Sequence, residues 1–203
     1  MTPNIHYEDR EIEDERIELP KHAIYFLGPN VTFRRCTLVL SVAARWLHLL
    51  SGKLIDCTIQ AKSEVTTLVW ATMSLKGCRF KGRFTGNDFG FREDDIDPWK
   101  LGGIEDCDFS EARLDGCRFF NCDMSAVRLP RWPCFTLMGP REHAAELSRH
   151  EWPGRFGNLI EGLTRIPEGT VAVTWYAPTV AQTLDTTVEE LHAALERMPW
   201  VVM

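Results

Sequence analysis

The sequence predicts a mainly β fold, namely a short right-handed parallel β-helix that carries a small C-terminal α/β cap. Three observations lead to this prediction. Cysteine recurs in one local frame, the frame first recurs at intervals of 21 residues, and it recurs every five residues over 107–131. Neither an α-helix nor an ordinary sheet has a period of five. A solenoid whose coil has four sides of about five residues accounts for both intervals.

The frame consists of an apolar residue, two variable residues, a cysteine, a variable residue and a second apolar residue. Six of the seven cysteines occupy its fourth position: Cys36, Cys57, Cys78, Cys107, Cys117 and Cys122. Successive coils of a parallel β-helix stack about 4.8 Å apart. We therefore expect these cysteines to form a structural inward column beside large apolar side chains. A buried free cysteine suits such a column because it behaves as a small hydrophobe.

The stretch 107–131 resembles the pentapeptide-repeat family. CDFSE, ARLDG, CRFFN, CDMSA and VRLPR are five consecutive matches to its pattern of a small residue, a polar residue, Leu or Phe, and two variable positions. Over 31–90 only one or two matches remain in each expected coil. The resemblance implies a β-helix architecture, and it implies little about function because one fold serves many roles.

Three regions are expected along the chain. Residues 1–23 form an acidic N-terminal arm, 24–136 form the β-helix with an insertion loop at 81–103, and 137–203 form the α/β capping region. Within the cap, 140–150 is expected to be a helix and 170–177 a strand. Thr186 to Glu189 has the pattern of a capping box that opens a helix. The last four residues are expected to pair with 170–176.

The insertion loop is the candidate partner-binding site. It contains an acidic cluster and a tryptophan: Glu93, Asp94, Asp95, Asp97 and Trp99. An insertion into a solenoid becomes a loop on one face, often the face that binds, and aromatic residues beside charges anchor protein interfaces. A plain solvated loop is the alternative. The carboxylates lack the spacing of a calcium-binding loop.

Catalytic and cofactor motifs are not found in the sequence. It contains no phosphate-binding GxxxxGK[ST], HExxH, GxSxG or GxGxxG motif. The cysteines lack the His or carboxylate partners at ligand spacing that a metal site needs. We therefore expect a protein that is not an enzyme and that has no catalytic residues, metal site or cofactor.

Charge and cysteine content bear on compartment and partners. The net charge of −6 disfavours nonspecific binding to nucleic acid, which requires a basic face. An odd number of cysteines without a CxxC pair is typical of a reducing compartment. No apolar run is long enough to cross a membrane, and the acidic N-terminus does not look like a signal peptide. We expect a cytoplasmic protein that does not bind membranes.

These features favour a bacterial interaction protein, most concretely an immunity protein or antitoxin that occludes the active surface of a co-encoded toxin. Two alternatives remain open. The family resemblance implies that the chain could mimic DNA and regulate a topoisomerase. The segment 179–197 has the spacing of a helix-turn-helix, although its second helix offers mainly acidic side chains towards DNA.

Overall fold

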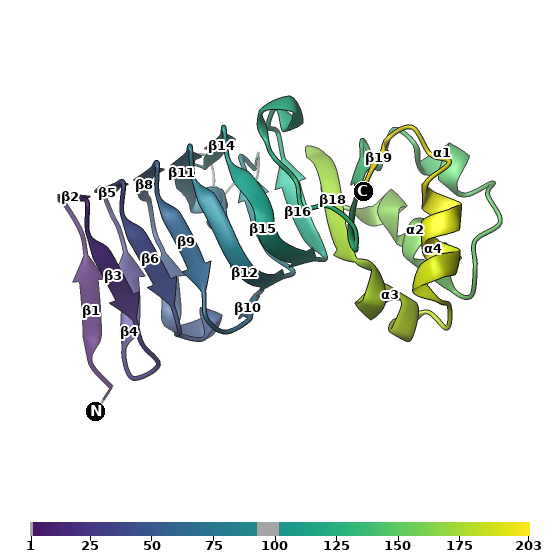
Figure 1. Cartoon of the computed structure of the whole chain (residues 1–203). Helices are drawn as coiled ribbons and strands as arrows, with labels where there is room; N and C mark the ends of the chain where they lie inside the picture. Colours follow the sequence, from purple (N-terminus) through teal and green to yellow (C-terminus); the bar gives the residue numbers. More distant parts are fainter. Residues whose placement is uncertain (1, 93–101) are drawn as a thin grey trace.

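The strands wind into a parallel solenoid whose C-terminal end is closed by a unit of helices and antiparallel strands (Figure 1). The structure is a computed structural model that describes residues 2–92 and 102–203. The predicted mainly β fold, its parallel stacking and the presence of a few short helices are confirmed. None of the helices in the described ranges is both long and apolar enough to cross a membrane.

Four sheets contain the strands. Side 1 consists of β2 (Glu11–Glu13), β5 (Val31–Arg34), β8 (Gly52–Ile55), β11 (Met73–Lys76) and β14 (Gly103–Glu105). Side 2 consists of β3 (Arg16–Leu19), β6 (Thr37–Leu40), β9 (Thr58–Ala61), β12 (Arg79–Thr85) and β15 (Asp108–Asp115), with β10 (Val65–Thr66) beside the second half of β12. Side 3 consists of β1 (Asn4–Tyr7), β4 (Ile24–Leu27) and β7 (Leu47–Leu49). The end sheet runs in the order β13 (Asp88–Gly90), β16 (Cys117–Phe120), β18 (Thr170–Tyr176), β17 (Cys134–Met138) and β19 (Val201–Val202).

Neighbouring coils are stacked at the intervals that the sequence predicts. Thr37 pairs with Thr58, and Thr58 pairs with Arg79, so each of these steps is 21 residues. Arg79 then pairs with Asp108 after 29 residues, and Asp108 forms a bridge to Arg128 after a further 20. The last step is one complete coil with sides of five residues. This explains why the sequence pattern recurs every five residues over 107–131.

The inward cysteines do not all share the single column that was predicted. Four of them lie one above another, each just before a paired residue of side 2: Cys36, Cys57, Cys78 and Cys107. Cys117 instead lies across from Asn87, and Cys122 follows β16. Each step of five residues moves the chain to the next side, so these two residues face inward from other sides of the same coil. Cys122 is half-buried, whereas the other cysteines are buried.

Left-handed backbone conformations mark the corner between side 1 and side 2 in every coil. Five residues with φ between 50° and 62° occupy this corner: Asp14, Arg35, Asp56, Gly77 and Asp106. Each of the first four donates its backbone N–H to a carbonyl of the next coil at 2.8–3.0 Å. Glycine, aspartate and asparagine tolerate this conformation best, so the corner is encoded by four of these five residues.

The predicted acidic arm is instead the first coil of the solenoid. β1, β2 and β3 pair in parallel with β4, β5 and β6 of the next coil. Ile12 lies across from Phe33 and Ile17 from Leu38, at the same interval of 21 residues as the cysteines. The charged residues beside them on the same strands, Glu11, Glu13, Arg16 and Glu18, point outward, because side chains alternate along a strand. The acidic composition of this segment therefore led to the prediction of an arm, although the segment forms a regular coil.

The predicted insertion at 81–103 is also narrower than expected. β12 continues to Thr85 and β13 follows at once, so the coil is complete as far as Gly90. Phe84 and Phe89 are fully buried in it. A polar side chain supports the turn between the two strands: Asn87 donates to the carbonyls of Val65 and Thr85 and accepts from the indole N–H of Trp70.

The closing unit continues the solenoid without a break in hydrogen bonding. β18 pairs antiparallel with β16, β17 pairs with β18, and β19 pairs with β17. Helices α1 (Ala144–Leu147), α2 (Phe156–Gly162), α3 (Ala177–Thr183) and α4 (Val188–Leu195) pack beside this sheet (Figure 1). Their apolar residues form a second core around Phe135, Phe156 and Leu191.

Several details of this unit differ from the prediction. β17 spans the predicted boundary at 136, because its partners belong to the closing unit. The C-terminal strand pairs with β17 and not with 170–176. The helix expected over 140–150 is a single turn, α1. The capping box lies one residue later than predicted, between Thr187 and Glu190. The strand predicted at 170–177 is present as β18.

Candidate functional site

The predicted partner-binding residues lie outside the described part of the chain. Glu93, Asp94, Asp95, Asp97 and Trp99 belong to the segment 93–101, so their contact role stays a prediction. The site must therefore be sought among the described coils and the closing unit. Three features stand out there: a charged notch, the acidic first coil, and a groove where the solenoid meets the closing unit.

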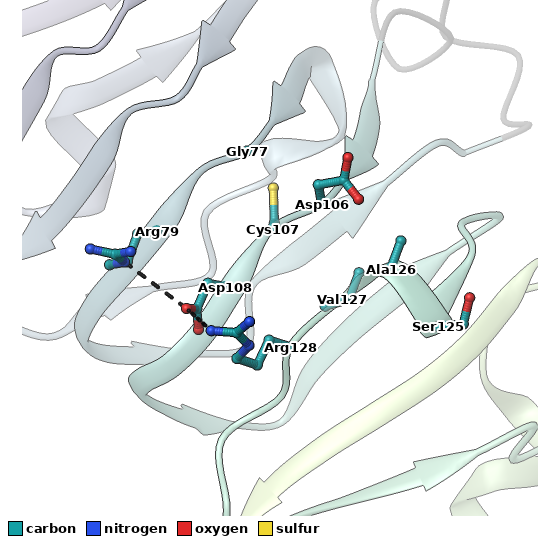
Figure 2. Close-up of a pocket in the computed structure, with 9 residues that line it drawn as sticks. All are labelled: Gly77, Arg79, Asp106, Cys107, Asp108, Ser125, Ala126, Val127 and Arg128. Atoms are coloured by element: carbon teal, nitrogen blue, oxygen red, sulfur yellow. Dashed lines mark hydrogen bonds and ion pairs between the residues drawn. The ribbon is translucent and has the colours of Figure 1, made fainter.

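The charged notch is a hollow of about 620 Å³ on the later coils. It is lined by Gly77, Arg79, Asp106, Cys107, Asp108, Ser125, Ala126, Val127 and Arg128. Figure 2 shows Asp108 between two cations, with interactions to Arg79 (4.0 Å) and Arg128 (3.2 Å). Asp108 also accepts hydrogen bonds from the N–H and the hydroxyl of Ser110.

These contacts determine what the notch can do chemically. Partial burial raises the pKa of Asp108, but the hydrogen bonds from Ser110 and the cations Arg128 and Arg79 hold it below its usual value. A carboxylate stabilised in this way is a poor general base, because its proton affinity is low. The notch is consequently a structural network of ion pairs on the solenoid surface.

The buried thiols donate hydrogen bonds to backbone carbonyls of the solenoid. The S–H of Cys57 donates to the carbonyls of Phe33 and Ile55, both at 3.3 Å. Burial raises the pKa of Cys117 and of Cys122 to about 12. Such thiols stay protonated and unreactive near neutral pH. Within residues 2–92 and 102–203, no group of three or more His, Cys, Asp or Glu side chains is placed to hold a metal ion.

The first coil carries most of the net charge of the protein. Residues 2–19 contain seven carboxylates: Glu8, Asp9, Glu11, Glu13, Asp14, Glu15 and Glu18. Against these stand two arginines, which gives 2 − 7 = −5, compared with −6 for the whole chain. The coil therefore forms a negative end on a molecule whose remaining residues are nearly balanced.

At this same end, the outer strand edges have no pairing partner among the described residues. β1, β2 and β3 are the outermost strands of side 3, side 1 and side 2. Their apolar side chains Ile5, Tyr7 and Ile12 are only half-buried. Edge strands present unpaired backbone groups to other chains, and charged side chains are a common protection against aggregation. The first coil thus combines outer strand edges with a concentration of negative charge.

Some of its carboxylates are engaged by the next coil and some remain free. Arg34 pairs with Glu11 and Glu13, and Arg35 pairs with Glu13 and Asp14. The hydrogen bond from Arg35 lowers the pKa of Asp14. Glu15 is exposed and forms no ion pair with any described residue. Glu8 lies 3.9 Å from Nδ1 of His6, which is charged only when protonated.

The groove between solenoid and closing unit has a volume of about 310 Å³. Leu159, Trp175 and Leu184 supply apolar walls, and Asp115 is its buried acidic group. Burial raises the pKa of Asp115, while the hydrogen bonds from the backbone N–H of Tyr176 (3.3 Å) and from the Thr179 side chain lower it. Tyr176 is the N-cap residue of α3, so Asp115 caps this helix from the solenoid.

The acidic coil was visible in the sequence as a cluster but not as a surface. The missed signal is the interval of 21 residues from Ile12 to Phe33 and from Ile17 to Leu38. The segment around Ile12 and Ile17 contains no cysteine, so a search based on the cysteine frame does not detect this coil. The capping role of Asp115 had no local signal, because its partners follow about sixty residues later.

The fold and these surfaces define the chain as a short parallel β-solenoid with one closed end and one open, acidic end. No protein-family model, no curated protein and no solved structure matched the chain.

Proposed function

We propose that this chain is a non-enzymatic protein-binding module, most concretely a bacterial immunity protein that neutralises a cognate toxin by covering its active surface. The observation that carries the proposal is the coincidence of open strand edges with a charge of −5 on the first coil. A surface of this kind fits a basic partner, because electrostatic complementarity speeds association and disfavours wrong partners.

Rigidity supports this function. The first coil is held in register by three parallel ladders, and Arg34 and Arg35 fix several of its carboxylates in position. A pre-organised surface loses little conformational entropy when it binds. A toxin that acts on nucleic acid presents a basic groove, and fixed carboxylates would occupy the positions of phosphates there.

Engagement of the buried and half-buried carboxylates supports the non-enzymatic part of the proposal. Asp88 is paired with Arg118 at 2.7 Å and with Arg92 at 3.3 Å. Asp108 is held in the notch, and Asp115 caps α3. Each of these groups therefore has a structural task.

The test uses the purified full chain and the purified product of the adjacent gene. We expect a tight complex and loss of the toxic activity when the two proteins are equimolar. Glu8→Lys combined with Glu15→Lys reverses two carboxylates without breaking an Arg ion pair, and we expect it to weaken binding by about tenfold or more. Glu161→Lys combined with Glu189→Lys is the matched control, because both residues are exposed on the closing unit.

Raising the salt concentration should weaken the wild-type complex and should affect the Glu8/Glu15 variant less. Equal affinity of the two double variants would show that the first coil is not the contact surface. An adjacent gene product that neither binds nor is inhibited would exclude the immunity function.

A further inference from the structure

Side 3 differs from the other sides in the chemistry that it shows to solvent. On side 1 the outward residues form ion pairs between coils, such as Glu13 with Arg34 and Lys76 with Glu105. On side 3 the outward residues of β4 and β7 are mostly apolar or aromatic. We call His6, Ile24, Phe26, Trp46, His48 and Leu50 the aromatic face.

The aromatic face is a continuous row across three coils. His6 pairs with Phe26 and Phe26 pairs with His48 in the strand register. Their rings are stacked, with centroids 4.6 Å apart for His6 and Phe26 and 4.8 Å apart for Phe26 and His48. Ile24 opens β4 and Trp46 directly precedes β7, and these two strands are paired. The stacked rings hold this part of the surface rigid.

Two of its members are unusually exposed for their type. Trp46 is 37% exposed and Leu50 is 41% exposed, and Val202 is the other large hydrophobic residue with comparable exposure in the described chain. Trp46 directly precedes and Leu50 directly follows the strand that carries His48, β7 (Leu47–Leu49), and all three are exposed. Isolated apolar residues at a surface are ordinary, but a rigid group containing an exposed tryptophan is typical of an interface.

Cations border one margin of this face. Arg45 lies over the Trp46 ring at 5.6 Å, and both Arg45 and Lys21 are exposed. Neither cation forms an ion pair with a described residue. Lys21 precedes β4 and Arg45 precedes β7, and these two strands pair in parallel, so the two cations belong to the same margin. Glu8 lies at the opposite end of β1, beside His6.

We propose that the aromatic face is a second docking surface and that its occupant is an acidic segment of a partner protein with aromatic or aliphatic anchors. The apolar side chains of the segment would pack on Phe26, Trp46 and Leu50, and its carboxylates would pair with Lys21 and Arg45. This charge preference is opposite to that of the acidic first coil. The aromatic face therefore takes a different partner, or a different part of the same partner.

The test begins with a phage-displayed library of short random peptides selected on the immobilised full chain. We expect enrichment of peptides that combine carboxylates with aromatic or aliphatic residues. Trp46→Ala with Leu50→Ala should weaken the binding of the selected peptides by about tenfold or more. The matched control is Val202→Ala, which removes an equally exposed apolar side chain on β19 and should leave affinity unchanged.

A charge reversal tests the second half of the proposal. Lys21→Glu with Arg45→Glu should weaken the same peptides several-fold, whereas Arg149→Glu on the closing unit should not. Enrichment of basic peptides, absence of any enriched sequence, or equal binding by the Trp46/Leu50 variant would overturn the proposal. Trp46-dependent binding to anionic phosphatidylglycerol vesicles would also overturn it, because the face would then be a lipid-binding surface.

Discussion

The two ends of the solenoid solve the problem of exposed strand edges in different ways. At the C-terminal end, β18 and β17 add to β16, and helices cover the apolar residues behind them. At the N-terminal end, β1, β2 and β3 stay at the edge and carry seven carboxylates between them and their turns. Added strands and helices cover the C-terminal end, whereas negative charge protects the strand edges of the N-terminal end. Among the described strands, β1, β2 and β3 at the charged end have outer edges whose backbone groups are available to a partner.

The largest expected effect compares one inward column at the two ends. Ile17 starts this column in the first coil, and Phe109 lies in the last full coil, stacked on Phe80 at 4.5 Å. Phe109→Ala should lower the free energy of unfolding by about 3–5 kcal/mol, because it opens a cavity in an aromatic cluster. Ile17→Ala should cost only about 2 kcal/mol, since the open end can relax around the gap.

Urea unfolding followed by circular dichroism measures both values. If Ile17→Ala proved as costly as Phe109→Ala, the first coil would be as tightly packed as the closed end. The contrast between the ends would then be one of charge alone.

A medium effect is expected at the junction with the closing unit. Asp115→Ala removes the acceptor for the Tyr176 N–H and should lower the free energy of unfolding by about 1–3 kcal/mol. Asp115→Asn keeps an acceptor oxygen and removes the desolvation cost of the charge, so it should be neutral or stabilising at neutral pH. Thermal unfolding of the two variants separates these effects. Equal destabilisation by both would contradict the capping role.

The same residue gives a pH dependence with a definite sign. Burial raises the pKa of Asp115 above its unfolded value, so the folded chain holds this proton more tightly than the unfolded chain. The contribution to stability is greatest below the unfolded pKa and is lost as pH rises through the folded pKa. Wild type should therefore lose stability relative to Asp115→Asn over this window. A constant difference from acid to neutral pH would contradict this assignment.

The smallest effect on stability is expected at the open end. Glu8→Gln with Glu15→Gln should change the free energy of unfolding by less than about 0.5 kcal/mol, because both side chains are exposed. The double variant should, however, increase self-association. Its lower negative charge weakens the repulsion that keeps the strand edges of two molecules apart. Sedimentation velocity measures this at several protein concentrations. Glu161→Gln with Glu189→Gln is the control, and equal association by both variants would refute charge protection.

The regularity of the coils was predictable because packing in a stacked interior imposes it on the sequence. Cys36, Cys57, Cys78 and Cys107 reveal the column directly. The first coil was harder to recognise, because Glu15 stands where the next coils have cysteine and an exposed end tolerates a polar residue there. The predicted start of the insertion loop, residue 81, was wrong for a related reason. Phe84 and Phe89 lie among Gly, Lys and Arg residues that resemble a loop.

Candidate surfaces were less predictable than the coils. The aromatic face depends on which strands become neighbours, and its rows run across the coils and not along the chain. His6, Phe26 and His48 are separated by about twenty residues each and share no motif. The junction at Asp115 depends on a pairing between distant strands. Only the acidic character of the N-terminal segment could be taken from composition alone.

The antiparallel closure also sets an order of folding during translation. Each coil contacts the preceding one across about 21 residues, whereas Cys117 pairs with Thr174, 174 − 117 = 57 residues later. Local contacts form faster than distant ones, so the coils can assemble one by one as the ribosome releases them. Until β18 emerges, β16 is an uncovered edge of low charge, and the nascent chain is most prone to aggregate at this stage.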